Sequence, residues 1–244
     1  MLDTDINKLS GEYEVIVEAL ILSLKSSDSA ESEQVLKMIE ALRQNIQIML
    51  RLSSDVDNKN QPDIGEDEVT KIGDYALNLL DEISISCASR GMQDQMLELH
   101  RLSLPIVLWL KKHNGKVIKL DIIVNAIASY ANTIKDNKQL EVLSGVIKNI
   151  IDVTDESIKQ DLEATNPMRP WRILNLNWGI VATRTHNPEV MQNVFDQLIK
   201  NIPVDSQQFF NEGMQQMDIV GYPEPVREVM QKYAGGFGVQ GVRH

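Results

Sequence analysis

Apolar residues recur three or four positions apart through almost the whole of this 244-residue chain. On an α-helix this spacing gathers them on one face, so it predicts amphipathic helices that pack together through those faces. No run of β-branched residues alternates with polar ones between turn signals, so no strand is expected. The sequence therefore predicts an all-α protein of about eleven helices.

The spacing of these helices predicts how they are arranged. A helix with its loop takes about 22 residues, so a pair repeats at about 44, within the range of helical-hairpin arrays. The pattern is most regular in 121–151, 170–200 and 205–233. We expect an array of antiparallel helical hairpins, in outline a tetratricopeptide-repeat-like (TPR-like) or HEAT-like α-solenoid. No window carries the tetratricopeptide consensus, so an irregular helical bundle is the alternative.

Breaks in the helical pattern divide the chain. Residues 1–52 are expected to form an N-terminal helical hairpin, and the polar, acidic stretch 53–66 a linker or loop. Residues 67–233 are expected to form a helical-repeat-like domain. Residues 234–244 hold four glycines and are expected to be a flexible tail.

One proline lies inside a helical pattern. Pro105 falls within the pattern of residues 93–113. Proline has no backbone N–H and its ring clashes with the preceding turn, so we expect this helix to be kinked or split.

Charge is distributed unevenly along the chain, whose formal net charge is −11. Residues 1–100 hold 8 basic and 20 acidic residues, whereas residues 101–200 hold 13 and 10. This distribution disfavours nucleic acid and anionic membranes as partners, because both need a concentrated basic face. The acidic part is interpreted either as a solvated surface or as a docking face for a basic partner.

The sequence also bears on location. The N-terminal residues are acidic and lack the basic and apolar regions of a signal peptide. The densest apolar stretch, residues 102–110, is far shorter than the roughly twenty residues that span a bilayer. A cytoplasmic protein is therefore expected.

Residue patterns typical of catalysis, metal binding or phosphate binding do not occur. The histidines, His100, His113, His186 and His244, form no His-Glu-x-x-His motif, and no glycine-rich phosphate loop follows a strand pattern. The single cysteine, Cys87, lies on an apolar stripe and is interpreted as a small buried side chain. We expect no cofactor and no metal. Whether the chain is an enzyme is left open, with the missing motifs favouring a non-catalytic protein.

The segment 167–186 is the best candidate for a binding site. It holds three arginines and two of the three tryptophans, residue types enriched at the centres of protein interfaces. The alternative is that both tryptophans belong to the core and the arginines pair with the acidic first half. The candidate partner-binding residues are Arg169, Trp171, Arg172, Trp178 and Arg184.

Methionines gather in the last helices of the pattern. Flexible methionine side chains suit binding surfaces that adapt to different partners, although ordinary core packing explains such methionines more often. The residues concerned are Met191, Met214, Met217 and Met230, with Phe209 and Phe210 beside them.

These features favour a non-catalytic protein–protein interaction module, such as an adaptor, an assembly factor or a chaperone-like helical-repeat protein. The expected partner is another protein, and self-association is left open. One alternative is a structural subunit of a larger complex. The other is a helical enzyme or small-ligand sensor with a pocket between helices near Pro105, Trp109, Trp171 and Trp178.

Overall fold

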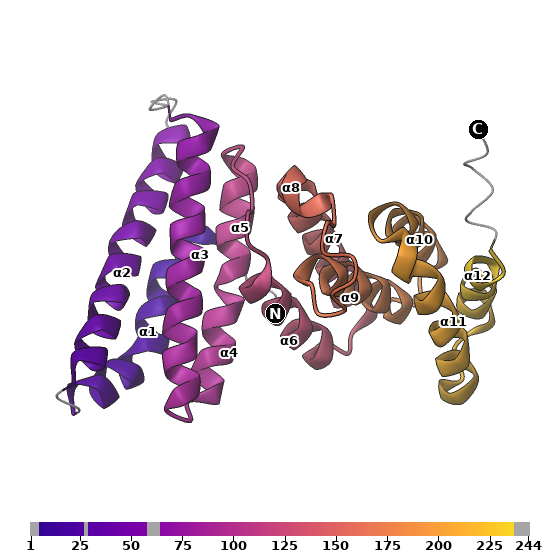
Figure 1. Ribbon diagram of the computed structural model, residues 1–244, viewed down its shortest axis with the longest axis horizontal. Helices are drawn as coiled ribbons and strands as arrows, with labels where there is room; N and C mark the ends of the chain where they lie inside the picture. Colours follow the sequence, from indigo (N-terminus) through magenta and orange to yellow (C-terminus); the bar gives the residue numbers. More distant parts are fainter. Residues whose placement is uncertain (1–4, 27–28, 58–63, 237–244) are drawn as a thin grey trace. The chain divides into compact units, whose positions relative to one another are not determined.

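The computed structural model describes residues 5–26, 29–57 and 64–236. Over these ranges the protein is all-α, with twelve helices and no strand (Figure 1). The only extended pairing among them is an isolated bridge between Val117 and Thr154. The prediction that the chain is all-α is therefore confirmed.

The helices range from 4 to 28 residues in length. Helices α1 to α6 are Ile6–Lys25, Ala30–Asp57, Glu66–Ser89, Gln93–Arg101, Ser103–Lys112 and Asp121–Thr133. Helices α7 to α12 are Asn137–Val153, Glu156–Lys159, Pro170–Arg184, Pro188–Asn201, Pro203–Val220 and Glu224–Ala234.

The pattern of residues 93–113 forms two helices, which accounts for one helix more than the eleven expected. Helix α4 ends at Arg101 and α5 begins at Ser103, so the chain breaks at Leu102. Pro105 is thereby the third residue of α5. At that position a backbone N–H has no partner within the helix, so its absence costs no hydrogen bond. The predicted split is confirmed.

The chain forms two compact units. The N-terminal unit extends to Ser129 and includes Asn149–Asp155; the C-terminal unit comprises Tyr130–Lys148 and the chain from Glu156 onward. Helices α6 and α7 each contribute residues to both units. Of the stretch expected to be a linker, residues 53–57 belong to α2, and positions 58–63 lie outside the described residues. Positions 237–244 of the expected tail also lie outside them.

The N-terminal unit packs the apolar face of α1 against α2, α4 and α5, with α3 lying against α2, α4 and α5. Tyr13 is fully buried, and its hydroxyl donates a 3.0 Å hydrogen bond to the carbonyl of Ile39. The buried indole N–H of Trp109 donates to the carbonyl of Met49 over 3.2 Å. The polar atoms of these large side chains are thus satisfied inside the core.

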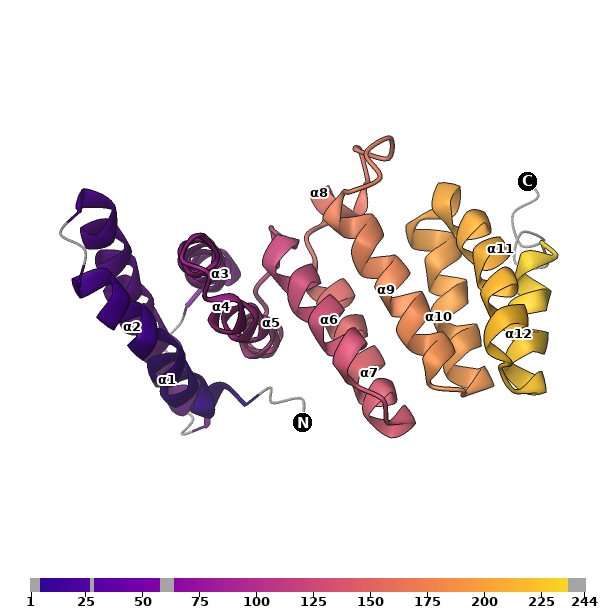
Figure 2. The same cartoon turned by 90° about the horizontal axis from the view of Figure 1, so that it is seen from below.

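In the C-terminal unit, helix α10 packs against α9, α11 and α12, and α11 packs along α12 (Figure 2). Asn187 caps α10 by accepting a 3.1 Å hydrogen bond from the backbone N–H of Glu189. Helices α9 to α12 each carry a proline in the first turn, as the sequence predicts at Pro170 and Pro188. The rings of Phe195, Phe210 and Tyr233 lie 5.0–5.3 Å apart and form the aromatic centre of the core.

Within the described ranges, no helix combines the length and the apolar character needed to cross a bilayer.

Candidate functional site

The structure brings two of the five predicted binding residues together. Arg169 and Arg172 both donate to the carboxylate of Asp205 at the start of α11, over 2.5 and 2.7 Å. Arg169 also forms a bidentate pair with Asp161, at 2.5 and 2.9 Å. The arginines thus pair with Asp161 and Asp205 and not, as the alternative interpretation had it, with acidic residues of the first half.

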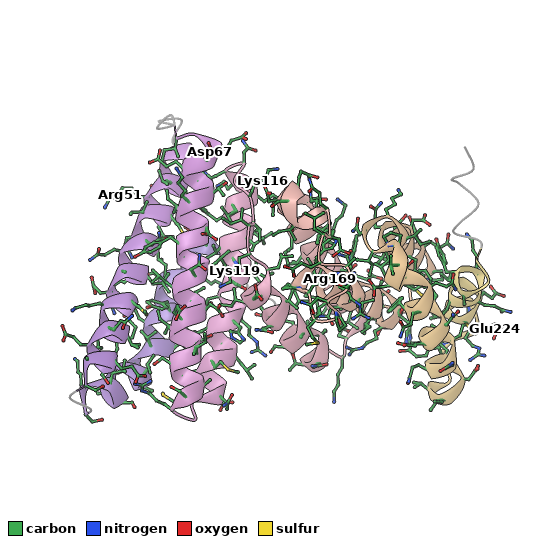
Figure 3. All side chains as sticks on the ribbon, in the orientation of Figure 1. Arg51, Asp67, Lys116, Lys119, Arg169 and Glu224 are labelled. Carbon is green, nitrogen blue, oxygen red and sulfur yellow. The ribbon has the colours of Figure 1, made fainter. Side chains whose placement is uncertain are left out.

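This ionic cluster joins the loop before α9 to α11. The side chain of Arg169, labelled in Figure 3, is only 3 % exposed, whereas that of Arg172 is 21 % exposed. Burial raises the pKa of Asp205, but hydrogen bonds from Arg172 and Arg169 outweigh burial and hold that pKa below its ordinary value. Removing one member would leave buried charge uncompensated, so loss of either partner is expected to destabilise the unit.

Trp171 and Trp178 are both buried and share the inward face of α9. The indole N–H of Trp171 donates to the carbonyl of Asn201 over 3.1 Å, and that of Trp178 to Ser144 Oγ over 2.9 Å. Both tryptophans therefore have their polar atom satisfied within the C-terminal unit.

Arg184 occupies a different place from the other two arginines. Its guanidinium donates to the carbonyls of Ala131 and Ile134 near the end of α6, the latter over 2.7 Å. These carbonyls have no helical partner, and a cation there also favours the helix dipole. Of the five predicted residues, Arg184 alone lines the apolar groove described next.

A groove of about 330 Å³ lies between α9 and α11. One wall is formed by Ile180, Thr183 and Arg184 of α9. Ile180 and Val220, at its rim, are large apolar side chains exposed to solvent. Such exposure beside a concave surface marks a place where another molecule can bury apolar area.

The second wall of the groove comes from α11, and its floor from α11 and α12. Phe209, Glu212 and Val220 lie along the wall, and the buried side chains of Met217 and Met230 lie at the floor. Gly213 makes this floor possible, because a Cβ there would lie 2.7 Å from the terminal methyl of Met230.

Glycine also sets the approach of α9 to α11. A Cβ on Gly179 would lie 2.6 Å from the Phe209 ring, so only glycine lets that ring pack against α9. The groove is thus shaped by two glycines and a phenylalanine.

The rims of the groove carry opposite charges. Arg184 lies on the α9 side and Glu212 on the α11 side. The partners of Arg184 are neutral carbonyls, and Glu212 accepts a hydrogen bond from the neutral amide of Gln208 over 2.7 Å. Neither charge is neutralised by these partners, so both influence what the groove attracts.

The reactive side chains lie outside this groove. Burial raises the pKa of the Cys87 thiol to about 11, so that thiol is a poor nucleophile. Burial lowers the pKa of His100, whose Nε2 lies 3.1 Å from Ser84 Oγ. Among the described residues, no three or more His, Cys, Asp or Glu side chains gather as a metal site would require.

Part of the groove lining comes from the methionine-rich helices, whose pattern allowed either a binding surface or core packing. Met217, Met230 and Phe209 line the groove, and Met217 and Met230 are also buried. Ile180 and Val220 were missed. Ile180 gives a usable signal, because it lies off the inward stripe of α9 at a position where a polar residue is expected.

Comparison of the chain with family models, with curated proteins and with solved structures found no match.

Proposed function

We propose that this chain is a non-catalytic protein-interaction module. Its helical hairpins form a TPR-like or HEAT-like array, and the groove between α9 and α11 binds an amphipathic helix of another protein. The observation that carries the proposal is the apolar groove itself, with Ile180 and Val220 exposed at its rim.

The dimensions of the groove suit a helix. Its α11 wall extends from Phe209 to Val220, which corresponds to about 16 Å at 1.5 Å per residue. This length matches about three turns of a bound helix, which would place anchors at i, i+4 and i+7 into the groove. The methionine floor would adapt to the shape of those anchors.

Charge favours an orientation for this helix. An acidic residue on the flank facing α9 would lie near Arg184, and a basic residue on the opposite flank would lie near Glu212. Opposite charges at a rim steer association and fix orientation more than they add affinity. The preferred occupant is therefore an apolar-faced helix with an acidic and a basic flank.

Adjacent packing of hairpins supports the array. Helices α9–α10 and α11–α12 are consecutive pairs, and α10 contacts both members of the second pair. In arrays of this kind each pair packs only on its neighbours, and the binding surface lies along one set of helices. The groove lies between the first helices of these two pairs.

A displayed library of amphipathic helical peptides tests the proposal. Peptides enriched on the wild-type protein are measured against Val220→Glu and against Val142→Glu by fluorescence anisotropy. Val220 is 64 % exposed and Val142 58 % exposed, so a charge at either position leaves the core intact. A circular dichroism melt of each variant verifies this.

We expect apolar-faced helices to be enriched and Val220→Glu to weaken their binding at least about tenfold, the equivalent of 1.4 kcal/mol. Val142→Glu should bind like the wild type. The proposal fails if no helical peptide is enriched, or if both variants bind the enriched peptides equally well. A groove of about 330 Å³ also reaches the lower limit of small-molecule sites. A metabolite that raises the melting temperature of the wild type but not of Val220→Glu would favour the ligand-sensor alternative instead.

A further inference from the structure

Helix α12 ends beside the groove between α9 and α11. Met230 lies at the groove floor, and Ala234 follows four positions later, so both residues lie on the same face of α12. The carbonyl of Ala234 accepts a 3.0 Å hydrogen bond from the side-chain amide of Gln207, two positions before the groove residue Phe209. The chain therefore leaves α12 next to one end of the groove.

The residues that continue the chain from this point have the composition of a groove ligand. Residues 237–244 include the apolar side chains Phe237, Val239 and Val242 and no acidic residue. Two glycines lie between these apolar residues, at positions 238 and 241. Glycine has no side chain to hold a backbone away from a surface, so the segment is suited to close contact with an apolar wall.

The segment is long enough to reach along the groove. At 1.5 Å per helical residue, Glu212 lies about 7.5 Å and Gln216 about 13.5 Å along α11 from Gln207. The six residues from Gly236 to Val242 span up to about 20 Å when extended, at 3.3 Å per residue. Val242 can therefore reach the middle of the groove without any change in the helices.

Charge favours the same placement. Helix α11 holds three acidic residues and no basic one. Asp205 and Asp218 each pair with arginine, whereas Glu212 forms no ion pair with any residue that the structure describes. The segment 237–244 brings a single arginine, Arg243, which is complementary to the one carboxylate of α11 without such a partner.

We propose that residues 237–244 occupy the groove when no partner is bound, and that a partner helix must displace them. Val239 and Val242 pack on the methionine floor, and Arg243 faces Glu212. The inference rests on the proposed function, because it gives the binding site of that function a competitor within the same chain. A segment tethered this closely has an effective concentration of about 1 mM, so even a weak contact fills the groove.

Disulfide trapping tests the contact without any partner. Gln215 and Gln216 are neighbouring exposed residues of α11, but only Gln216 lines the groove. Val242→Cys is therefore combined with Gln216→Cys or, as the matched control, with Gln215→Cys. The native Cys87 is buried and does not compete. Dilute protein is oxidised with copper phenanthroline, and the rate of intramolecular disulfide formation is followed by mass spectrometry.

We expect the pair at positions 216 and 242 to form its disulfide at least about tenfold faster than the control pair, because docking raises the local concentration of one thiol near the other. In the faster pair, Arg243→Glu should slow the reaction by roughly two- to fivefold, the effect of losing an exposed ion pair, and adding Glu212→Arg should restore it. Equal rates at positions 215 and 216 would overturn the proposal.

Truncation tests the competition. Removing residues 237–244 should tighten the binding of the enriched helical peptides at least about threefold, as expected for a competitor at about 1 mM effective concentration with a dissociation constant of about 0.5 mM. A full-length chain with Phe237→Ser, Val239→Ser and Val242→Ser should bind as tightly as the truncated one.

The two proposals fail in different ways. Peptides that bind the full-length and the truncated chain equally well would overturn the inference and leave the proposed function standing. If no peptide is enriched even on the truncated chain, the proposed function fails, whereas selective trapping at Gln216→Cys would still support occupation of the groove by residues 237–244.

Discussion

Replacing Arg169 by methionine should destabilise the C-terminal unit strongly. The substitution keeps most of the side-chain length but removes a cation that is 3 % exposed and joins Asp161 to Asp205. Breaking a buried ion pair from one side typically costs about 3–5 kcal/mol, because the remaining charge stays buried without its partner. We expect Arg169→Met to lower the free energy of unfolding by about that amount.

Urea unfolding followed by far-ultraviolet circular dichroism measures this difference. Arg172→Met is the matched control, because its side chain is 21 % exposed and makes a single contact with Asp205. A more exposed pair contributes less, so the control should lose roughly 1 kcal/mol or less. The difference between the two variants therefore measures how much more the buried Arg169 ion pairs contribute than the more exposed pair between Arg172 and Asp205.

The pH dependence of the free energy of unfolding provides a second test of the same cluster. The pKa of Asp205 is lower in the folded protein than its ordinary value of 3.8. The stability that Asp205 contributes is therefore complete above pH 3.8 and is lost as the pH falls toward the folded pKa. Arg169→Met removes one of the two guanidinium groups that lower this pKa, so the loss of stability in acid should become smaller. If Arg169→Met lowers the free energy of unfolding no more than Arg172→Met does at neutral pH, the structural role assigned to the cluster is wrong.

Three further predictions concern buried groups. Since burial lowers the folded pKa of His100 below 6.5, stability should decrease as the pH falls through 6.5, and His100→Gln should flatten that dependence in thermal melts; an unchanged slope would contradict the assignment. Gly179→Ala should lower the free energy of unfolding by roughly 1–3 kcal/mol, because its new Cβ would be forced against Phe209. Gly145→Ala, in open space on α7, should raise that free energy by about 0.5–1 kcal/mol. In chemical denaturation, equal effects of these two substitutions would refute the steric argument. At neutral pH, the folded protein should react with a thiol reagent at least about a hundredfold more slowly than the unfolded chain, because burial raises the pKa of Cys87 from 9.0 to about 11; fast labelling under native conditions would show that the thiol is accessible.

The helical period and the prolines predicted much of the fold. The pattern near Pro170 and Pro188 places helix starts correctly, because proline fits a first turn and no other part of a helix. The first helix begins at Ile6, because Asp5 accepts a hydrogen bond from the backbone N–H of Asn7 and caps it.

The candidate site shows where sequence reasoning ends. Residues 167–186 combine arginine with tryptophan in an acidic chain, but the pattern cannot show which acidic side chains the arginines meet. Asp205 is 33 residues after Arg172, and only the packing of α11 brings it there. The same holds for the groove, which needs Gly213 to face Met230 across two helices. Contacts between residues far apart in the sequence are set by tertiary packing. The local helical period carries no information about them.

Site-specific photo-crosslinking at the groove tests the proposed function most directly. The only native cysteine is buried, so a thiol-reactive photo-crosslinker can be attached selectively at Val220→Cys, with Val142→Cys as the control position. After irradiation in extract of the native host, mass spectrometry identifies the crosslinked segment. We predict that Val220→Cys alone crosslinks to one amphipathic helical segment of another protein, and that a peptide of that sequence competes with the crosslink. Identical products at both positions, or no protein product at Val220→Cys, would contradict the groove as a binding site.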